Sequence, residues 1–101
     1  MVIQIRKFQI NQGDPTDICR RAAEKLPPLL EKLPGFIDYY IVRGKGEYVF
    51  SVTVFENENG LNQAFEMVSH WTLREVKDIL SEPEIVQGDV IYAYSEKKKA
   101  A

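Results

Sequence analysis

The chain has 101 residues, of which 45 % are hydrophobic and 28 % are charged, values typical of one soluble globular domain. Its formal net charge at pH 7 is −2, and this weakly acidic balance provides no basic surface that would favour nucleic acid as a partner. A single cysteine excludes an intramolecular disulfide, and one cysteine with one histidine is too small a set for a nitrogen- or sulfur-ligated metal site.

The first predicted element is a strand at residues 2–10, VIQIRKFQI, in which β-branched and aromatic residues alternate roughly with polar ones. Arg6 is a charged residue inside this strand. It is explained by an edge position or by an ion pair, for example with Asp38, or alternatively by a role in anchoring an acidic ligand at the mouth of a cavity. The sequence leaves these interpretations open.

A helix is predicted to begin just after Asp14, because an aspartate can cap the first turn and Pro15 fits the first helical position. Apolar residues then recur at helical spacing along one face. Pro27 and Pro28 cannot donate hydrogen bonds to the preceding turn, so we expect a kink or a restart of the helix near Leu26.

Residues 35–43 and 47–55 form two β-rich runs joined by a short glycine-containing loop, which predicts a β-hairpin. Alternation along residues 47–55 divides the second run into two largely apolar faces. In the first run the same alternation groups Phe36 with Tyr40 and places Tyr39 on the opposite face. Neither strand therefore has a clearly polar side.

A second helix is predicted from residues 57–60 to about Leu80, with an apolar stripe along one face. By helical geometry, His70 lies opposite this stripe and is expected to be solvated. Trp71 lies on the flank of the stripe. A large ring there either seals the edge of the core or forms one wall of a cavity between helix and sheet, with Phe65 as a neighbour.

Residues 84–94 are predicted to form the last strand, in which Gly88 marks a candidate bulge. We assign residues 1–94 to a single domain and residues 95–101 to a flexible charged tail. No apolar run is long enough for a membrane span, and the N-terminus lacks the pattern of a signal peptide. We therefore expect a cytoplasmic protein.

The predicted order β-α-β-β-α-β is that of the ferredoxin-like α+β fold, a four-stranded antiparallel sheet with two helices on one face. Two helices cover only that face, and the other face of these strands would remain apolar and exposed. We therefore expect a homodimer in which the two sheets pack face to face.

The segments IRKF, LPGFIDYYIV, SVTVFENENG and PEIVQGDVI, together with the single tryptophan of the second helix, resemble the dimeric α+β barrel proteins related to antibiotic-biosynthesis monooxygenases. More narrowly, they resemble small and functionally uncharacterised members of that group. The resemblance extends over about residues 3–92 and implies the same fold and the same homodimer.

Some proteins of this group oxidise quinols or polycyclic aromatics with O₂ without a metal or a flavin, and hold the substrate between helix and sheet. Others degrade haem with an asparagine on the first strand, a tryptophan on the second helix and an iron-ligating histidine downstream. Trp71 corresponds to that tryptophan, but the strand near Arg6 has no asparagine and no histidine follows Trp71. The resemblance therefore disfavours haem binding or degradation.

Together, the sequence and the resemblance predict a monooxygenase without a cofactor that acts on a small aromatic or quinol-type compound. Its candidate ligand-binding residues are Trp71, Phe65 and Tyr40, with Arg6 as a polar anchor, and no catalytic residue, metal ligand or cofactor is assigned. The alternative is a non-catalytic homodimer that binds a small ligand or is associated with stress. The lack of a recognisable acid, base, nucleophile or metal cluster favours this alternative.

Overall fold

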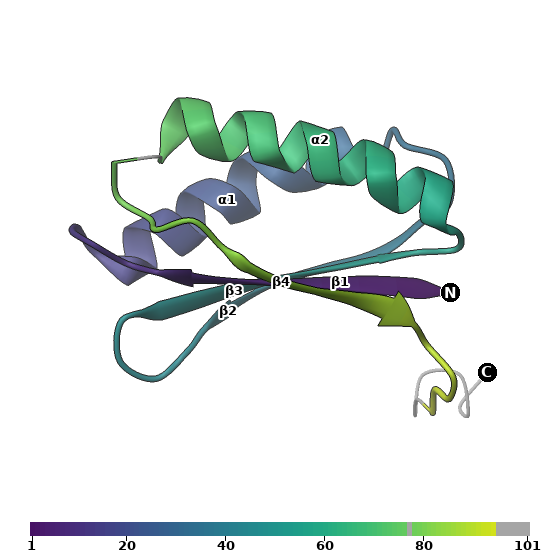
Figure 1. The fold of residues 1–101 in the computed structure, drawn as a ribbon. Coiled ribbons are helices and arrows are strands. Elements are labelled where there is room, and N and C mark those ends of the chain that lie inside the picture. Colours follow the sequence, from purple (N-terminus) through teal and green to yellow (C-terminus); the bar gives the residue numbers. More distant parts are fainter. Residues whose placement is uncertain (77, 95–101) are drawn as a thin grey trace.

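Four strands and two helices make up the computed structural model, which describes residues 1–76 and 78–94. The strands form one antiparallel sheet in the order β2-β3-β1-β4, and both helices cover the same face of it (Figure 1). The predicted ferredoxin-like α+β order is therefore confirmed. In chain order the elements are β1 (Val2–Gln9), α1 (Pro15–Leu30), β2 (Phe36–Arg43), β3 (Tyr48–Phe55), α2 (Glu58–Glu75) and β4 (Glu84–Asp89).

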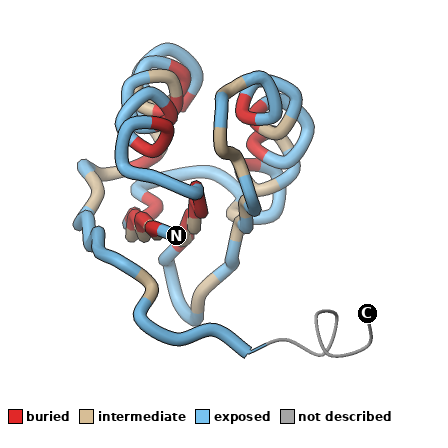
Figure 2. Tube along the Cα trace, turned by 90° about the vertical axis from the view of Figure 1, so that its right-hand side faces the viewer, coloured by how far each residue is buried: buried red, intermediate tan, exposed pale blue. Residues whose placement is uncertain are grey.

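The hydrophobic core lies between the two helices and the sheet. Figure 2 shows the helices side by side on one side of the sheet, with their buried residues directed inward. Leu26 and Leu30 of α1, Phe55 of β3 and Leu61 of α2 are almost completely buried there. Burial of each such side chain stabilises the fold by about 1.5–3 kcal/mol, so this layer contributes much of the stability.

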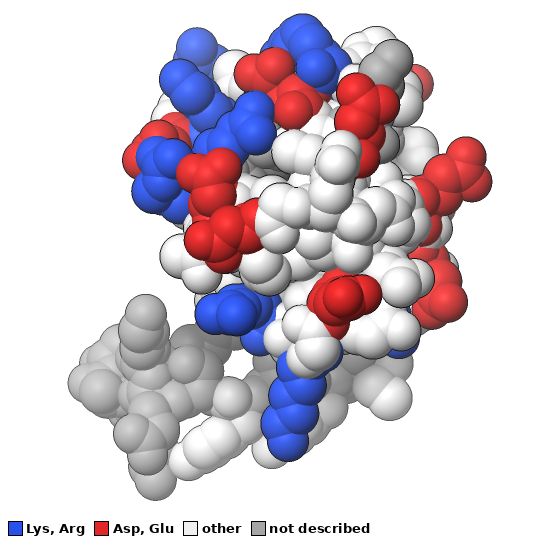
Figure 3. Space-filling view, turned by 90° about the vertical axis from the view of Figure 1, so that its left-hand side faces the viewer, with Lys and Arg blue, Asp and Glu red and all other residues white. Residues whose placement is uncertain are grey.

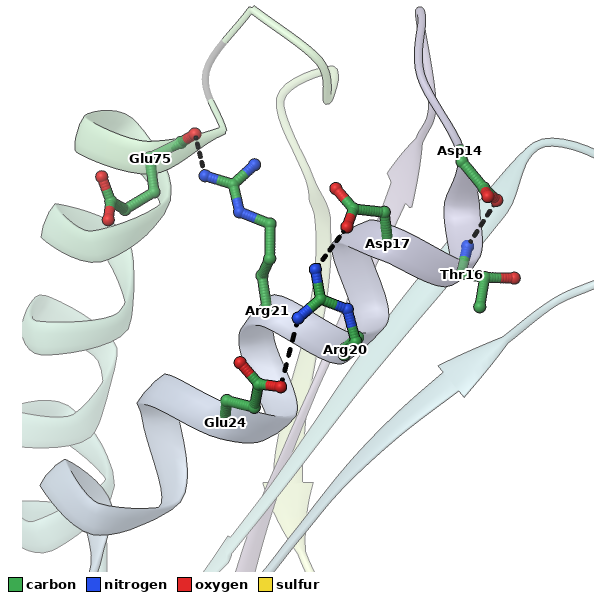
Figure 4. Close-up of polar contacts among 7 residues, drawn as sticks. All are labelled: Asp14, Thr16, Asp17, Arg20, Arg21, Glu24 and Glu75. Carbon is green, nitrogen blue, oxygen red and sulfur yellow. Dashed lines mark hydrogen bonds and ion pairs between the residues drawn. The ribbon is translucent and has the colours of Figure 1, made fainter.

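Side-chain caps start both helices where the sequence predicts. The Asp14 carboxylate accepts a hydrogen bond of 2.9 Å from the backbone N–H of Thr16 at the start of α1 (Figure 4). At the start of α2, the Asn57 side chain accepts one of 3.0 Å from the N–H of Gly60. Each cap satisfies a backbone donor that has no partner inside its own helix.

Arginines on α1 hold neighbouring groups together (Figure 4). Arg20 pairs with Asp17 at 2.7 Å and with Glu24 at 3.2 Å along the exposed side of the helix. Arg21 donates a hydrogen bond of 3.3 Å to the backbone carbonyl of Glu75, the last residue of α2. A carbonyl at a helix C-terminus has no partner in its own helix, so this contact both caps α2 and joins it to α1.

The first helix continues through Pro27 and Pro28 as far as Leu30, so the expected restart near Leu26 is wrong. The two prolines lie in the last turn of the helix, so the helix loses only their own two N–H donors and keeps the backbone bonds of the preceding turns. Leu26 and Leu30 flank them and are both buried. The N–H of Glu31 donates to the carbonyl of Pro27 at 2.9 Å, which continues the helical pattern. Core packing here outweighs the low helix propensity of proline.

The second helix ends at Glu75 rather than near Leu80. After the helix, the chain turns and bonds to the end of β1: Leu80 forms a bridge with Ile10, and the N–H of Ser81 donates to the carbonyl of Gln9 at 2.8 Å. None of the described helices is long and apolar enough to cross a membrane.

The last strand also ends earlier than predicted, at Asp89. Asp89 pairs with Val2, the first residue of β1, and one further backbone hydrogen bond follows, from the N–H of Val90 to the carbonyl of Met1 at 2.9 Å. Residues 90–94 leave the sheet on the side away from the helices, and the Ile91 side chain is 97 % exposed (Figure 1). The expected charged tail, residues 95–101, lies outside the described residues.

The irregularity that we expected at Gly88 lies instead in β2. The pairing of β1 with β4 is continuous through Gly88, whereas the pairing of β2 with β3 shifts between Phe36 and Asp38. The shift turns Phe36 toward the helices, where its ring packs edge-on against Phe55 with centroids 5.6 Å apart. Phe36 and Tyr40 therefore lie on opposite faces of the sheet, and the predicted grouping of the two is wrong.

The face of the sheet opposite the helices is apolar. Its exposed side chains include Tyr40, Val42, Tyr48 and Val86, and no described helix covers it (Figure 1). At one end of the molecule, acidic and basic side chains are interspersed around an uncharged area (Figure 3). That surface has no continuous field of one sign and so does not favour nucleic acid.

Candidate functional site

A stripe of polar residues is buried on the side of the sheet that faces the helices. It comprises Gln4, Arg6, Ser51 and Thr53, which are 2–4 % exposed. They are neighbours across the sheet, because Arg6 pairs with Ser51 and Gln4 pairs with Thr53. Apolar residues normally occupy such positions beneath helices, so this polar floor marks the candidate site.

A chain of side-chain hydrogen bonds holds the Arg6 guanidinium in place. Its Nε donates to Oε1 of Gln4 at 2.9 Å, and its Nη2 donates to the backbone carbonyl of Phe65 on α2 at 2.9 Å. Gln4 in turn donates from Nε2 to Oε1 of Gln87 on β4 at 2.8 Å. The guanidinium also lies 4.5 Å from the centroid of the Phe65 ring, a cation–π contact.

This cation has no opposite charge beside it in the described part of the chain. Arg6 lies on a central strand, and Asp38 is exposed on the other face of the sheet, so the expected edge position and ion pair are both wrong. Burial lowers the pKa of Arg6 from its ordinary value, although a guanidinium keeps its proton in proteins. The result is a buried positive charge held by neutral groups alone.

Arg6 forms one wall of a pocket of about 150 Å³, which we call the outer pocket. The pocket lies between β1, the second half of α2 and the connection to β4. Most of its lining is apolar or hydroxyl-bearing, and the Arg6 Nη1 has no hydrogen-bond partner among the described residues. The lining residues are Arg6, Phe8, Ser69, Thr72, Leu73, Leu80, Ser81, Glu82 and Pro83.

A second, inner cavity of about 30 Å³ lies beneath Trp71. Its lining is almost entirely apolar, except for the hydroxyls of Tyr39 and Ser51, which are buried there beside each other and have no further hydrogen-bond partner among the described residues. Burial raises the pKa of Tyr39, so this hydroxyl keeps its proton. The volume suits a water molecule or two rather than an aromatic ring. Phe8, Thr72 and Leu80 line both spaces and separate them.

A model of one protein family, described as antibiotic biosynthesis monooxygenase, matches residues 1–71. The chain belongs to the antibiotic biosynthesis monooxygenase family. No curated protein matches the sequence. The family match covers β1, α1, β2, β3 and most of α2, and therefore the polar floor and most of the inner cavity, but only Arg6, Phe8 and Ser69 of the outer pocket.

Solved structures show the same fold at low sequence identity. The haem degrader MhuD from Mycobacterium tuberculosis, with two haems in its active site, is 17 % identical, with a TM-score of 0.73 over 94 % of this chain and 100 % of that one. SnoaB, a cofactor-independent oxygenase from Streptomyces nogalater, is 13 % identical, with a TM-score of 0.70 over 91 % and 94 %. A protein of unknown function from Nitrosomonas europaea is 16 % identical, with a TM-score of 0.76 over 93 % and 92 %.

In this antibiotic biosynthesis monooxygenase fold, three of the four predicted site residues lie on the helix side of the sheet. Trp71 is buried and lines the inner cavity, Arg6 lines the outer pocket, and Phe65 is partly exposed and contacts Arg6. Tyr40 is 52 % exposed on the opposite face, so the structure does not bring it together with the other three. His70 is exposed on α2, as predicted.

Sequence reasoning missed the other members of the polar floor, Gln4, Ser51 and Thr53, and the polar groups beside it, Gln87 and Tyr39. The buried face of α2 also lies closer to Trp71 than the predicted apolar stripe does. Ala64 is therefore buried, whereas Phe65 is partly exposed. A signal was available in β1, where Gln4 and Arg6 share one face with Val2 and Phe8. Two polar residues at alternate positions predict a polar face, and here that face meets the helices.

Proposed function

We propose that the protein is a homodimeric oxygenase that acts on a small aromatic compound of the quinol type without a metal or a flavin. The observation that carries this proposal is the buried polar floor beneath α2, from which the Nη1 group of Arg6 faces a mainly apolar pocket. A pocket that is mainly apolar, with a few convergent polar groups, is typical of small-molecule sites. Membership of the antibiotic biosynthesis monooxygenase family supports the reaction class.

Without a metal or a flavin, the electrons that reduce O₂ must come from the substrate. A quinol satisfies this condition: it loses a hydroxyl proton to solvent, and the electron-rich anion reduces O₂. One oxygen atom enters the ring as a hydroxyl group, the other leaves as water, and the quinol becomes a hydroxyquinone. The chain would contribute a dry site and a fixed positive charge, supplied by Arg6. Phe8, Leu73 and Leu80 would exclude water from the substrate and help to orient its ring.

The apolar open face supports the homodimer. Tyr40, Val42 and Val86 are exposed there at the surface of a sheet whose other face is covered by helices. Such a surface favours burial against a second copy, with the two sheets packed face to face. Proteins of this family are typically dimeric. The exposed segment at residues 90–94 lies on the same side and would add to that contact.

Oxygen consumption tests the proposed reaction. The purified protein, treated with a chelator and freed of bound small molecules, is mixed with a panel of naphthalene and anthracene quinols in an oxygen electrode. We expect uptake above the spontaneous rate for at least one quinol, with formation of the oxidised product. If every quinol in the panel is oxidised only at the spontaneous rate, the protein is not such an oxygenase.

The second candidate is a homodimer that binds such a compound without reaction. It is favoured by one observation: in the described lining of the two pockets there is no histidine, and the one carboxylate, Glu82, is exposed. Saturable binding of a quinol without oxygen uptake would support this candidate. Haem degradation is not proposed, because the first strand offers Arg6 in place of an asparagine and His70 points to solvent.

A further inference from the structure

We propose that Arg6 recognises an ionised oxygen on the ligand, so that the outer pocket selects aromatic anions over neutral aromatics of the same shape. The inference rests on the site of the proposed function, but it concerns binding and does not require turnover. The shared chemistry is an anionic oxygen on a planar ring, which either a phenolate or an aromatic carboxylate can supply.

The first argument is the uncompensated charge. Arg6 is 3 % exposed, and no carboxylate pairs with it in the described part of the chain. A buried cation without an anion is costly for a fold, and structures normally pair it. Its persistence on a central strand, next to a pocket, indicates that a ligand supplies the missing charge.

The second argument is orientation. Two of the five guanidinium N–H groups are used, by Gln4 and by the carbonyl of Phe65, and these bonds fix the plane of the group. The Nη1 group remains without a partner in the described residues, and Arg6 lines the pocket. Gln4 is itself held by Gln87, so the guanidinium does not need to reorganise when an anion binds.

The third argument concerns the other charges near the pocket. Glu82 is the one carboxylate in the described lining; it is exposed and forms no ion pair with Arg6. Tyr39, from the neighbouring inner cavity, stays neutral because burial raises its pKa. The remaining lining residues carry no charge at neutral pH. The positive charge of Arg6 therefore dominates the inner wall of the pocket, and Glu82 opposes anions only at its rim.

Three nitroaromatic probes test the inference on the full-length protein by calorimetric titration. 4-Nitrophenolate and 4-nitrobenzoate each carry an anionic oxygen, whereas 4-nitroanisole is a neutral compound of similar shape. We expect at least one of the anions to bind wild type about tenfold more tightly than 4-nitroanisole, as a charged hydrogen bond to a buried donor provides. The stronger of the two anions identifies phenolate or carboxylate as the oxygen recognised.

Substitutions then assign the preference to one residue. Arg6→Gln is expected to weaken binding of the preferred anion by about 10- to 100-fold while 4-nitroanisole binds as before. Arg20→Gln, the same change at an exposed arginine of α1, is the matched control and should leave both affinities unchanged. Glu82→Gln removes the opposing charge at the rim and should tighten anion binding by about two- to threefold, as for an exposed charge.

Equal affinity of wild type for the anions and for 4-nitroanisole overturns the inference, as does an equal loss of anion binding in Arg6→Gln and Arg20→Gln. If Arg6→Gln does not fold, as judged by circular dichroism, two measurements decide whether the inference holds: the preference of wild type for an anion over 4-nitroanisole, and the effect of Glu82→Gln on anion binding. The two proposals fail separately. Anion-selective binding without oxygen uptake supports the role of Arg6 and contradicts the proposed oxygenase reaction. Oxygen uptake without anion selectivity supports the oxygenase reaction and contradicts the role of Arg6.

Discussion

Replacement of Trp71 by alanine tests whether this residue closes the core or only borders it. The side chain is 6 % exposed, belongs to the core between the helices and the sheet, and forms part of the wall of the inner cavity. Truncation of a buried tryptophan to alanine lowers the free energy of unfolding by about 3–5 kcal/mol. Because Trp71 already borders a void of about 30 Å³, it makes fewer contacts than a fully enclosed ring. We therefore expect a loss of about 3 kcal/mol, the lower end of that range.

Urea denaturation measures this loss. Circular dichroism in the far ultraviolet is the appropriate signal, since Trp71 is the only tryptophan in the chain and its fluorescence is absent from the variant. Leu73→Ala is the matched control: Leu73 lies on the same helix and is 62 % exposed, so its truncation should change stability by no more than about 0.5 kcal/mol.

Indole provides a second measurement on Trp71→Ala. If the truncated side chain leaves an open space that joins the existing cavity, indole at ten times its Kd should stabilise the variant by about 1.4 kcal/mol and leave wild type unaffected. A loss of less than about 1 kcal/mol in Trp71→Ala, similar to that of Leu73→Ala, would refute the assignment of Trp71 to the core.

Three further predictions follow from the open face and the inner cavity. Tyr40→Arg places a charge on the exposed apolar face and should convert a dimer to a monomer in sedimentation; an unchanged dimer mass would contradict sheet-on-sheet packing. Ser51→Ala removes a buried hydroxyl whose polar neighbour is the Tyr39 hydroxyl and should change the free energy of unfolding by no more than about 1 kcal/mol, whereas a larger loss would mean that water also satisfies this hydroxyl. Burial raises the pKa of Tyr39 in the folded state, so above its ordinary pKa of 10.0 the unfolded state binds fewer protons and stability falls as pH rises. Tyr39→Phe should reduce that alkaline loss and Tyr92→Phe, at an exposed position, should not; equal pH profiles for the two variants would contradict this assignment.

Local signals in the sequence were sufficient for the order of elements. Asp14 and Asn57 cap the helices as predicted, and alternation along β3 separates its two faces correctly. The homodimer was inferred from the same alternation, because both faces of the strands are apolar. These features depend on residues within a few positions of one another, and such residues are neighbours in any conformation of that element.

The positions where prediction failed all depend on partners distant in the sequence. The last strand ends at Asp89, where it pairs with the first residue of β1, Val2, more than eighty positions away. The second helix ends at Glu75 because the next residues bond to the end of β1. Neither boundary has a local signal, so no pattern within the segment itself would have revealed it.

The candidate site shows the same division. Alternation in β1 determined that Gln4 and Arg6 share one face and that Ile3 and Ile5 share the other. From hydrophobicity alone, the isoleucine face would be predicted to pack against the helices. In the tertiary structure the face with Gln4 and Arg6 packs against the helices instead, because Arg6 donates a hydrogen bond to a carbonyl on α2 and Gln4 donates one to Gln87 on β4. A strand pattern fixes which residues point the same way, but which face meets the helices depends on partners that only the folded chain brings together.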